Sequence, residues 1–353
     1  MRVVRTLGGM LCWLTAMVLA GCESCAGRRG DAGGGGSSRR DAAPPGMGED
    51  GSTGDVPRPP PPPPPDEDSC EKMDILFVID DSGSMAEEQG NLRANFPRFV
   101  EVLDGFLTAD GEPLDYRIGV TTTGRPTTVE IRFPPTFPFP PMTMMENGPN
   151  GALLRSERCG MRRPWIERSD PDVSGTFSCI ASVGTSGSSI EMPLLMTQRA
   201  VSDRIADGSN AGFLRDDALL AVVILTDEND CSRTDDPIVI EIPDPFSGGV
   251  MAAVDHCDPT LPALTPVASI VSALDAVKGD RGRWAVAAIA GPGPGVCRSA
   301  FGEAQDATRV REFVMLTGDN AVFSSICEGD LAGALMRALQ TFDAACESFP
   351  PLI

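Results

Sequence analysis

Four short apolar runs most constrain the fold of this chain. Residues 75–79, 219–225 and 284–290 are almost uninterrupted in their apolar character, and residues 116–121 form a weaker fourth run. Runs of this length without regular polar alternation are typical of parallel strands that are buried on both faces. The sequence therefore predicts a buried, mostly parallel sheet.

Helical patterns separate and follow these runs. Apolar side chains spaced three and four residues apart predict helices over residues 92–106, 267–277 and 331–342, and another helical stretch covers residues 190–201. Pro97 falls inside the first pattern, so we expect that helix to be kinked or to start late. Strands that alternate with helices indicate a doubly wound α/β domain, with a Rossmann-like sheet flanked by helices.

The N-terminal segment has the features of a targeting sequence. Two arginines precede an apolar stretch over residues 7–19, which is too short to span a membrane as a stable helix. It ends in Leu19-Ala20-Gly21-Cys22, which closely resembles the lipobox of bacterial lipoproteins. The resemblance implies that residues 1–21 are a signal peptide and that Cys22 is lipidated. An ordinary signal peptide with a coincidental cysteine is the alternative.

Residues 22–69 lack the apolar side chains needed for a core. A glycine run at residues 33–36 and a proline tract at residues 59–65 predict a flexible segment followed by a stiff polyproline rod. We interpret residues 22–69 as a lipidated tether and residues 70–353 as the folded domain. Glu23 follows the lipidated cysteine, which favours the outer membrane, facing either the periplasm or the cell surface.

The charge balance narrows the classes of partner. The chain has 50 acidic and 29 basic residues and a formal net charge of −21. Because nucleic-acid binding requires a basic surface for the phosphates, that class is disfavoured. The negative charge instead favours metal cations and basic partners.

Two long stretches interrupt the alternation of strands and helices. Residues 124–183 and 228–264 are both rich in proline and glycine, and each contains two cysteines. Loops of this length are either functional or disordered. The cysteines indicate that both stretches are ordered insertions.

Acidic and hydroxyl side chains directly follow two of the predicted strands. The first strand leads into Asp80-Asp81-Ser82-Gly83-Ser84, and a later strand leads into Thr226-Asp227-Glu228-Asn229-Asp230. Ligands of open α/β sheets bind beyond the carboxyl ends of strands, so the two clusters predict one binding site. A strand-end turn with an aspartate capping a helix is the alternative interpretation.

These two segments strongly resemble the von Willebrand factor A (VWA) family. The matching residues are FVIDDSGSM at 77–85 and VILTD at 223–227, and the resemblance covers roughly residues 70–346 with the two long stretches as insertions. It implies a metal-ion-dependent adhesion site (MIDAS). The implied metal ligands are Asp80, Ser82, Ser84, Thr185 and Asp227.

The resemblance also implies a role for each ligand. Ser82 and Ser84 bind the metal directly through their hydroxyls, whereas Asp80 and Asp227 hold it largely through waters. A threonine from an intervening loop completes the set. We assign it to Thr185, with Ser186 and Ser188 as rivals.

The expected ion is Mg²⁺, with Mn²⁺ or Ca²⁺ as alternatives. Mg²⁺ takes six oxygens in a near-octahedral arrangement and retains waters. Neutral hydroxyl ligands leave its charge poorly cancelled, so an open position attracts an acidic side chain of a protein partner. Glu228 stands where the family usually has glycine, and Asp81 and Asp230 add further carboxylates. This extra negative charge favours tighter cation binding or Ca²⁺, and it opposes capture of an acidic ligand.

Eight of the eleven cysteines lie in the expected folded domain, and an even number in an exported chain indicates disulfides. Cys12 leaves with the signal peptide, Cys22 takes lipid, and the pairing of Cys25 stays open. The ends of a VWA domain lie close together, and each insertion holds two cysteines. The expected pairs are Cys70–Cys346, Cys159–Cys179, Cys231–Cys257 and Cys297–Cys327.

We therefore expect an adhesion or protein-interaction module on the cell envelope. A metal-stabilised scaffold of the envelope, without a metal-bridged ligand, is the alternative. Enzymatic activity is not expected. No G-x-S-x-G motif surrounds Ser82, Ser84 or Thr185, and a serine triad would have to recruit His256, the only histidine.

Overall fold

The computed structural model describes residues 70–350, apart from residues 109, 138, 243, 245–256, 301 and 330. All of them belong to the second of the two units into which the chain divides, Pro61–Ile353. The expected signal peptide, the lipidation site Cys22, the tether over residues 22–69 and His256 lie outside the described residues.

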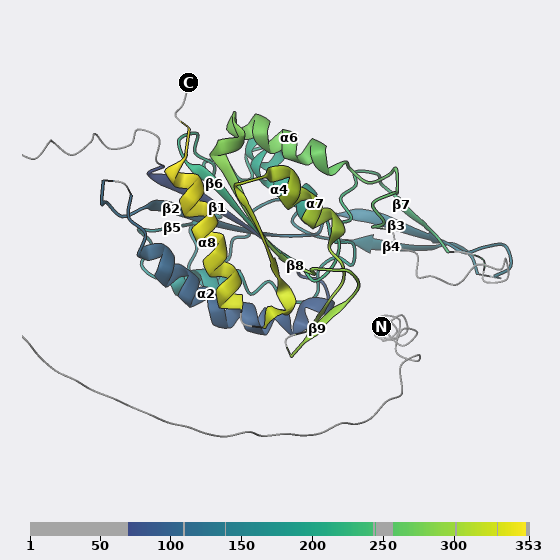
Figure 1. The fold of residues 1–353 in the computed structure, drawn as a ribbon. Coiled ribbons are helices and arrows are strands. Elements are labelled where there is room, and N and C mark those ends of the chain that lie inside the picture. Colours follow the sequence, from purple (N-terminus) through teal and green to yellow (C-terminus); the bar gives the residue numbers. More distant parts are fainter. Residues whose placement is uncertain are drawn as a thin grey trace, which may run out of the picture. The chain divides into compact units, whose positions relative to one another are not determined.

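A six-stranded sheet forms the centre of the fold, in the order β11-β8-β6-β1-β2-β5 (Figure 1). Strand β5 is antiparallel to β2, and all the other pairings are parallel. The four predicted strands are confirmed, whereas the two edge strands β5 and β11 were not predicted. The strands are β1 (Lys72–Ile79), β2 (Asp115–Thr122), β5 (Ile166–Glu167), β6 (Leu219–Leu225), β8 (Trp284–Ala290) and β11 (Ala321–Ser325).

Helices cover both faces of this sheet. Helices α2 (Glu88–Asp104), α3 (Val173–Ile180) and α8 (Leu331–Glu347) share one apolar cluster with alternate residues of β1, including Phe77. Helices α4 (Pro193–Val201) and α6 (Val267–Lys278), together with Phe313 of α7 (Thr308–Thr317), share the other cluster with Leu76 and Val78. This two-sided burial explains the continuous apolar runs, because successive side chains of a strand point to opposite faces.

The predicted helices are present, with one correction and three additions. Helix α2 begins at Glu88, well before Pro97, and runs through it, so the late start that the proline suggested is wrong. Phe96 and Phe99 on either side of the proline are buried against Phe77, and this packing favours continued helix despite the lost backbone donor. Helices α3 and α7 were not predicted, and one short helix, α5 (Asp203–Ala206), follows α4.

A second, three-stranded sheet joins the two insertions. Strands β3 (Thr127–Arg132) and β4 (Met142–Glu146) form an antiparallel pair in the first insertion, and β7 (Ile238–Glu241) of the second insertion lies parallel to β3. We call this sheet of β3, β4 and β7 the arm (Figure 1). The sequence predicted two ordered insertions but not that they pair with each other.

The remaining elements are short. Strands β9 (Cys297–Ser299) and β10 (Gly302–Ala304) form a hairpin, and the 3₁₀ helices are η1 (Ser84–Ala86), η2 (Glu157–Cys159), η3 (Arg281–Arg283) and η4 (Ile326–Glu328). No helix in the described part of the chain is both long and apolar enough to cross a membrane.

All four predicted cysteine pairs are present. The Cα–Cα separations are 4.9 Å for Cys70–Cys346, 5.6 Å for Cys159–Cys179, 4.5 Å for Cys231–Cys257 and 6.2 Å for Cys297–Cys327. The first pair ties the start of β1 to the end of α8, and Cys70 N–H also donates a hydrogen bond to the carbonyl of Cys346. The second and third pairs lie in the first and second insertions, as expected.

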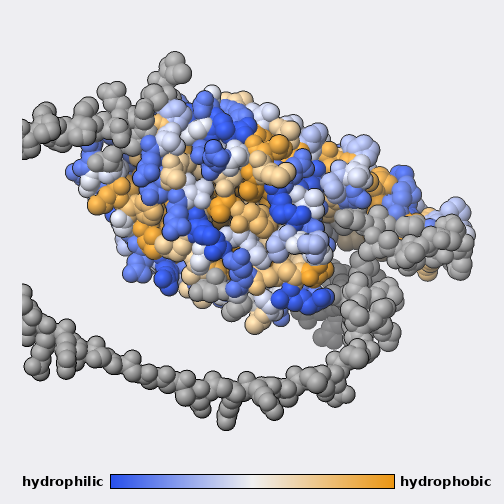
Figure 2. Space-filling view, viewed as in Figure 1, coloured by the Kyte–Doolittle hydropathy of each residue, from blue (hydrophilic) through white to orange (hydrophobic). Residues whose placement is uncertain are grey.

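The surface mixes hydrophilic and hydrophobic residues on the face that Figure 2 shows. Among the described residues, eight large apolar side chains are exposed, and four of them belong to the arm or the segment just before β4. Those four are Phe139, Met142, Met144 and Met145. The arm and the segment just before β4 therefore carry half of the exposed large apolar side chains that the structure describes.

Candidate metal centre

The register of the central sheet brings the two predicted acidic clusters together. Ile79 at the end of β1 pairs with Leu225 at the end of β6, so Asp80 and Thr226 leave the same sheet edge side by side. The Asp80 N–H donates to the Leu225 carbonyl at 2.9 Å. Backbone pairing alone therefore fixes the relative position of the two strand ends.

Both carboxylate oxygens of Asp80 accept hydrogen bonds. The backbone N–H of Ser82 donates to Oδ1 at 2.8 Å, and the hydroxyl of Thr226 donates to Oδ2 at 2.6 Å. Asp80 itself is fully buried. These two bonds hold its side chain in one orientation at the carboxyl edge of the sheet.

A chain of hydroxyls then links the two strand ends. The hydroxyl oxygens of Ser82 and Ser84 lie 2.8 Å apart, and Ser84 donates to Oδ1 of Asp227 at 3.2 Å. Four of the five predicted metal ligands are thus in one hydrogen-bonded network: Asp80, Ser82, Ser84 and Asp227. Metal binding by them stays a prediction.

The fifth predicted ligand lies apart from this network. Thr185 is exposed on the loop between α3 and α4, and within the described residues no hydrogen bond joins it to the other four. The loop nevertheless passes beside the site, since Gly187 N–H donates to the Asp81 carbonyl at 2.7 Å. A side chain at Gly187 would collide with the Asp81 carboxylate, so this approach requires glycine.

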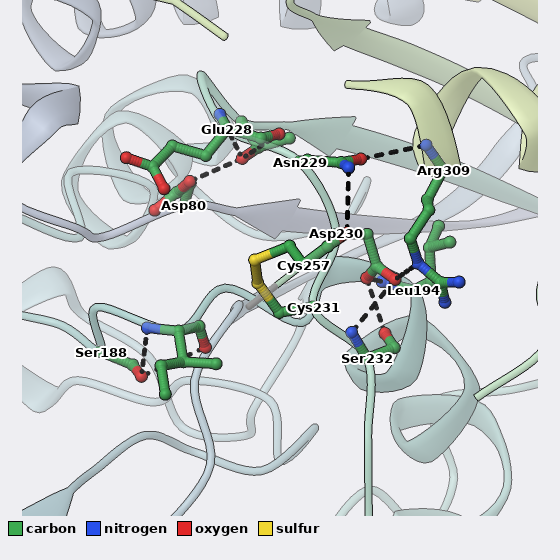
Figure 3. Close-up of a disulfide and its surroundings, with 12 residues drawn as sticks. Asp80, Ser188, Leu194, Glu228, Asn229, Asp230, Cys231, Ser232, Cys257 and Arg309 are labelled. Atoms are coloured by element: carbon green, nitrogen blue, oxygen red, sulfur yellow. Dashed lines mark hydrogen bonds and ion pairs between the residues drawn. A yellow bond between two sulfur atoms is a disulfide. The ribbon is translucent and has the colours of Figure 1, made fainter. Parts of the chain in front are cut away.

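The rival hydroxyls are no better placed. Ser186 is exposed, and the buried hydroxyl of Ser188 bonds with the backbone of Ile190 (Figure 3). The loop that the resemblance indicated passes beside the site, but the hydrogen bonds of the described residues join none of its three candidate hydroxyls to the network.

Glu191 in this loop was missed by the sequence analysis. Its side chain is 1% exposed, and its Oε2 atom has no hydrogen-bond partner among the described residues. Its carboxyl group bonds with that of Glu228 and feels the charge of Asp80. The only sequence signal was a single acidic residue between Ile190 and Met192, at the start of an apolar helix.

Burial and mutual repulsion raise the pKa of the carboxyl groups around the site. Burial, then the charges of Asp80 and Glu228, raises the pKa of Asp227 to about 8. Burial is also the largest cause for Asp81, whose pKa rises to about 6, and for Glu88, whose pKa rises to about 7. In the described part of the chain, the charges that act on these groups are those of other carboxyl groups.

Arg309 forms an ion pair with Asp230, which lies outside the network of the four predicted ligands. The Nε atom of Arg309 lies 3.1 Å from Oδ2 of Asp230, and both side chains are buried. Asp230 also accepts from the backbone N–H of Leu194 at 3.0 Å and from the hydroxyl of Ser232 at 2.6 Å (Figure 3). Because Asp230 already has an ionic partner, it adds less negative charge to the site than the sequence suggested.

The oxygen atoms around the site that have no arginine partner suit a hard cation. Buried oxygens of Asp81, Glu88 and Glu191 lack hydrogen-bond partners among the described residues. Carboxylate and hydroxyl oxygens are the ligands that Mg²⁺ and Ca²⁺ prefer. No set of three or more His, Cys, Asp or Glu side chains in the described residues is arranged to hold a metal alone. A cation here would therefore depend on the serine hydroxyls as well.

Comparison with known proteins gives weak matches only. No protein-family model and no curated protein matches the chain. Two structures of proximal thread matrix protein 1 from the mussel byssus, one with a zinc-occupied MIDAS motif, share 12% identity and a TM-score of 0.38 over 78% of this chain and 49% of theirs. The pilus adhesin SpaC from Lactobacillus rhamnosus GG shares 10% identity and a TM-score of 0.37, over 78% of this chain and 30% of its own.

This chain thus spans about half or less of the length of those structures. The strand order and the helix layers of the chain itself show a mixed α/β fold with a mostly parallel central sheet, which is consistent with a VWA-like fold.

Proposed function

We propose that this chain is a protein-interaction or adhesion module of the cell envelope that depends on a divalent cation. The observation that carries the proposal is the network of Asp80, Ser82, Ser84 and Asp227. Two adjacent strand ends build it, and no cationic side chain of the described residues balances its charge.

The chemistry of binding follows from these donors. When bound, the cation supplies a positive charge that attracts an anionic oxygen of a partner. Ser82 and Ser84 offer uncharged oxygens, so they hold the ion without cancelling its charge. Asp80 is held by Ser82 and Thr226, so it is oriented before any ion arrives. No bond has to be made or broken for such a module to act.

The arm supports a role in protein binding. Strand β3 starts five residues after β2 ends, so the arm leaves the sheet from the same edge as the strand-end cluster. Its exposed methionines, Met142, Met144 and Met145, offer flexible apolar side chains that adapt to a partner surface.

Anchoring on the envelope is the second part of the proposal and rests on the sequence alone. The lipobox ending at Cys22 supports a lipid anchor, and the outer membrane is the proposed location. Metabolic labelling with palmitate should mark the protein, and Cys22→Ser should release it from membranes. A soluble, unlabelled wild type would rule out the anchor.

Calorimetric titration of the full chain with Mg²⁺ or Mn²⁺ tests the metal centre. We expect one site in the wild type and none in Asp80→Ala. Asp319→Ala is the matched control, since Asp319 is exposed and precedes β11 at the opposite edge of the sheet. Equal binding by wild type and Asp80→Ala would contradict the proposal.

A second measurement separates adhesion from the alternative of a metal-stabilised scaffold. The buried carboxyl group of Glu191 and the partly buried one of Glu228 favour the scaffold, because they supply negative charge from within the chain. If the metal bridges to a partner, a short peptide with one glutamate should increase the metal affinity, and the metal should increase the peptide affinity equally. If neither the peptide nor the metal changes the affinity for the other, the scaffold is favoured.

A further inference from the structure

We propose that Glu191 is a direct ligand of the cation, in the place that the sequence assigned to Thr185, and that it gives the site a preference for Ca²⁺ over Mg²⁺. This inference rests on the metal centre of the proposed function and deepens it. It concerns which residues of this chain complete the centre and which ion they select.

The first support is an unsatisfied buried oxygen. Oε2 of Glu191 has no hydrogen-bond partner among the described residues, although the side chain is 1% exposed. A buried carboxylate oxygen without a partner is costly, so such atoms in folded proteins call for a ligand or another specific role. The group lies close enough to Asp80 and Glu228 to feel both charges. A cation shared with Asp80 would satisfy this oxygen.

The second support is the way the backbone fixes this residue. The carbonyl of Glu191 accepts a hydrogen bond from Cys231 N–H at 2.8 Å, and the next residue, Met192, donates to the carbonyl of Thr123 at 2.9 Å. Thr123 follows strand β2 and Cys231 follows the Asp227 segment, so Glu191 is held from two sides of the site. A ligand held in this way loses little conformational freedom when the ion binds.

Thr185 lacks both features. It is exposed, and it lies in the part of the loop that approaches the site through Gly187 and the backbone of Asp81. The loop thus reaches the site twice, once through glycine and once through Glu191. Only the second approach brings in a buried side chain with an unsatisfied oxygen.

The choice of ion follows from charge and geometry. With Glu191 as a ligand, the centre would draw on three carboxylates beside the hydroxyls of Ser82 and Ser84, in place of the two that the sequence implied. Ca²⁺ accepts six to eight oxygens in flexible arrangements and binds more tightly as the number of charged ligands increases. Mg²⁺ demands six at short, regular distances and gives up its waters reluctantly. A crowded, anionic set of oxygens therefore favours Ca²⁺.

A different explanation exists for the contact between Glu191 and Glu228. Two neighbouring carboxyl groups, here the buried Glu191 and the partly buried Glu228, can share one proton, which lowers the negative charge of the pair without any metal. That arrangement predicts that replacing Glu191 by its neutral amide leaves cation affinity unchanged. The cation affinity of Glu191→Gln therefore distinguishes a shared proton from a metal ligand.

The experiment is calorimetric titration of the full chain with Ca²⁺ and with Mg²⁺. We expect Glu191→Gln to weaken Ca²⁺ binding at least tenfold and Mg²⁺ binding less. Glu191→Thr should lower the ratio of Ca²⁺ to Mg²⁺ affinity, because it replaces a charged ligand by a hydroxyl. Thr185→Val is the control and should bind both ions within about twofold of the wild type.

Thermal unfolding with and without Ca²⁺ shows whether the variants fold. In the presence of a chelator, Glu191→Gln should melt at or above the wild-type temperature, since it removes one of several buried like charges. Added Ca²⁺ should raise the melting temperature of the wild type more than that of the variant. If Glu191→Gln does not fold, Glu191→Thr provides the same comparison.

Two results would overturn the inference. One is wild-type Ca²⁺ affinity in Glu191→Gln, and the other is loss of binding in Thr185→Val. If Asp80→Ala abolishes binding in the same series, only the role of Glu191 is wrong. If Asp80→Ala also binds normally, the metal centre itself is wrong.

Discussion

The central sheet and the arm are built from the same chain but bury very different shares of their side chains. Every residue of β6 is buried, and so are seven of the eight residues of β1. In β4 of the arm, four of the five residues are exposed. The arm is anchored to the domain core mainly through Val129 of β3 and Ile238 of β7, which join the apolar cluster around α4 and α6.

This difference in burial indicates different roles for the central sheet and the arm. Helices cover both faces of the central sheet, so its strand ends present the cluster around Asp80 from a rigid base. The arm buries little apolar surface and leaves its methionines exposed, so its sequence is less constrained by packing. We expect the centre to determine stability and the arm to determine what is bound.

The largest expected contrast is between two disulfides. Chain entropy gives the long Cys70–Cys346 loop a nominal contribution of about 5.5 kcal/mol and the shorter Cys231–Cys257 loop about 3.5 kcal/mol, both as upper figures. Cys70→Ser with Cys346→Ser should therefore lower the free energy of unfolding most in urea denaturation. Cys231→Ser with Cys257→Ser should weaken Ca²⁺ binding more, because Cys231 N–H holds the carbonyl of Glu191. If the loss of Cys231–Cys257 lowers the unfolding free energy more than the loss of Cys70–Cys346 does, the Cys70–Cys346 disulfide does not dominate stability.

The next contrast compares two phenylalanines. Phe77 is fully buried in β1, with ring centroids 4.8 Å from Phe177 and 5.3 Å from Phe99. Phe77→Ala should cost about 3–5 kcal/mol of unfolding free energy, since it leaves a cavity among aromatic rings. Phe139 before β4 is 58% exposed, and Phe139→Ala should change stability by about 0.5 kcal/mol or less. Equal losses in urea denaturation would mean that the arm is as tightly packed as the centre.

The same contrast explains what the sequence could predict. Continuous apolar runs revealed β1, β2, β6 and β8, because burial on both faces leaves a strong local pattern. Strand β11 was missed because it lies at a sheet edge and is only partly buried. The pairing of β3 with β7 was missed because its partners are more than a hundred residues apart and no local pattern records a non-local pairing.

In the candidate site too, residues at strand ends could be predicted from the sequence more easily than residues in a loop. The positions of Asp80, Ser82, Ser84 and Asp227 follow from two strand ends, which the sequence located. The family resemblance led to Thr185, which the structure leaves exposed and outside the network, and the loop before α4 has no strand to fix its register. Glu191 was overlooked because one acidic residue in an apolar stretch resembles the start of a helix.

A third prediction contrasts buried and exposed charges. Burial lowers the pKa of Lys278, at the end of α6, to about 8 from 10.5. The folded state then binds fewer protons than the unfolded state between pH 8 and pH 10.5, so stability should increase with pH in that window and be lowest below it. The full effect is at most about 3 kcal/mol.

Urea denaturation across this pH range tests the prediction, with Lys278→Met as the variant that should lose the increase. The exposed pair of Arg132 and Glu241 on the arm serves as the comparison. Glu241→Gln should leave the pH dependence unchanged, because exposed ion pairs contribute little. If the stability of Lys278→Met increases with pH by the same amount, other groups cause the pH dependence.

The smallest effect concerns the contact between the two insertions. Oδ1 of Asp236 accepts from the backbone N–H of Thr128 at 2.9 Å and from the hydroxyl of Thr127 at 3.2 Å. Asp236→Ala should cost about 1 kcal/mol and loosen the pairing of β3 with β7. Hydrogen exchange should increase in β3 while the amides of β1 and β6 stay protected. Faster exchange in all three strands would show that the arm and the centre open together.

The Cys70–Cys346 bond also determines how the domain would carry tension. A pull on the chain ahead of Cys70, resisted by a partner at Asp80, acts along the whole length of β1. The backbone of β1 carries load that is resisted at Asp80, whereas any share resisted at Asp227 after β6 would load the many parallel β1–β6 hydrogen bonds at once in shear. The disulfide fastens the pulled end of β1 to α8, so β1 cannot be peeled away from that end one bond at a time.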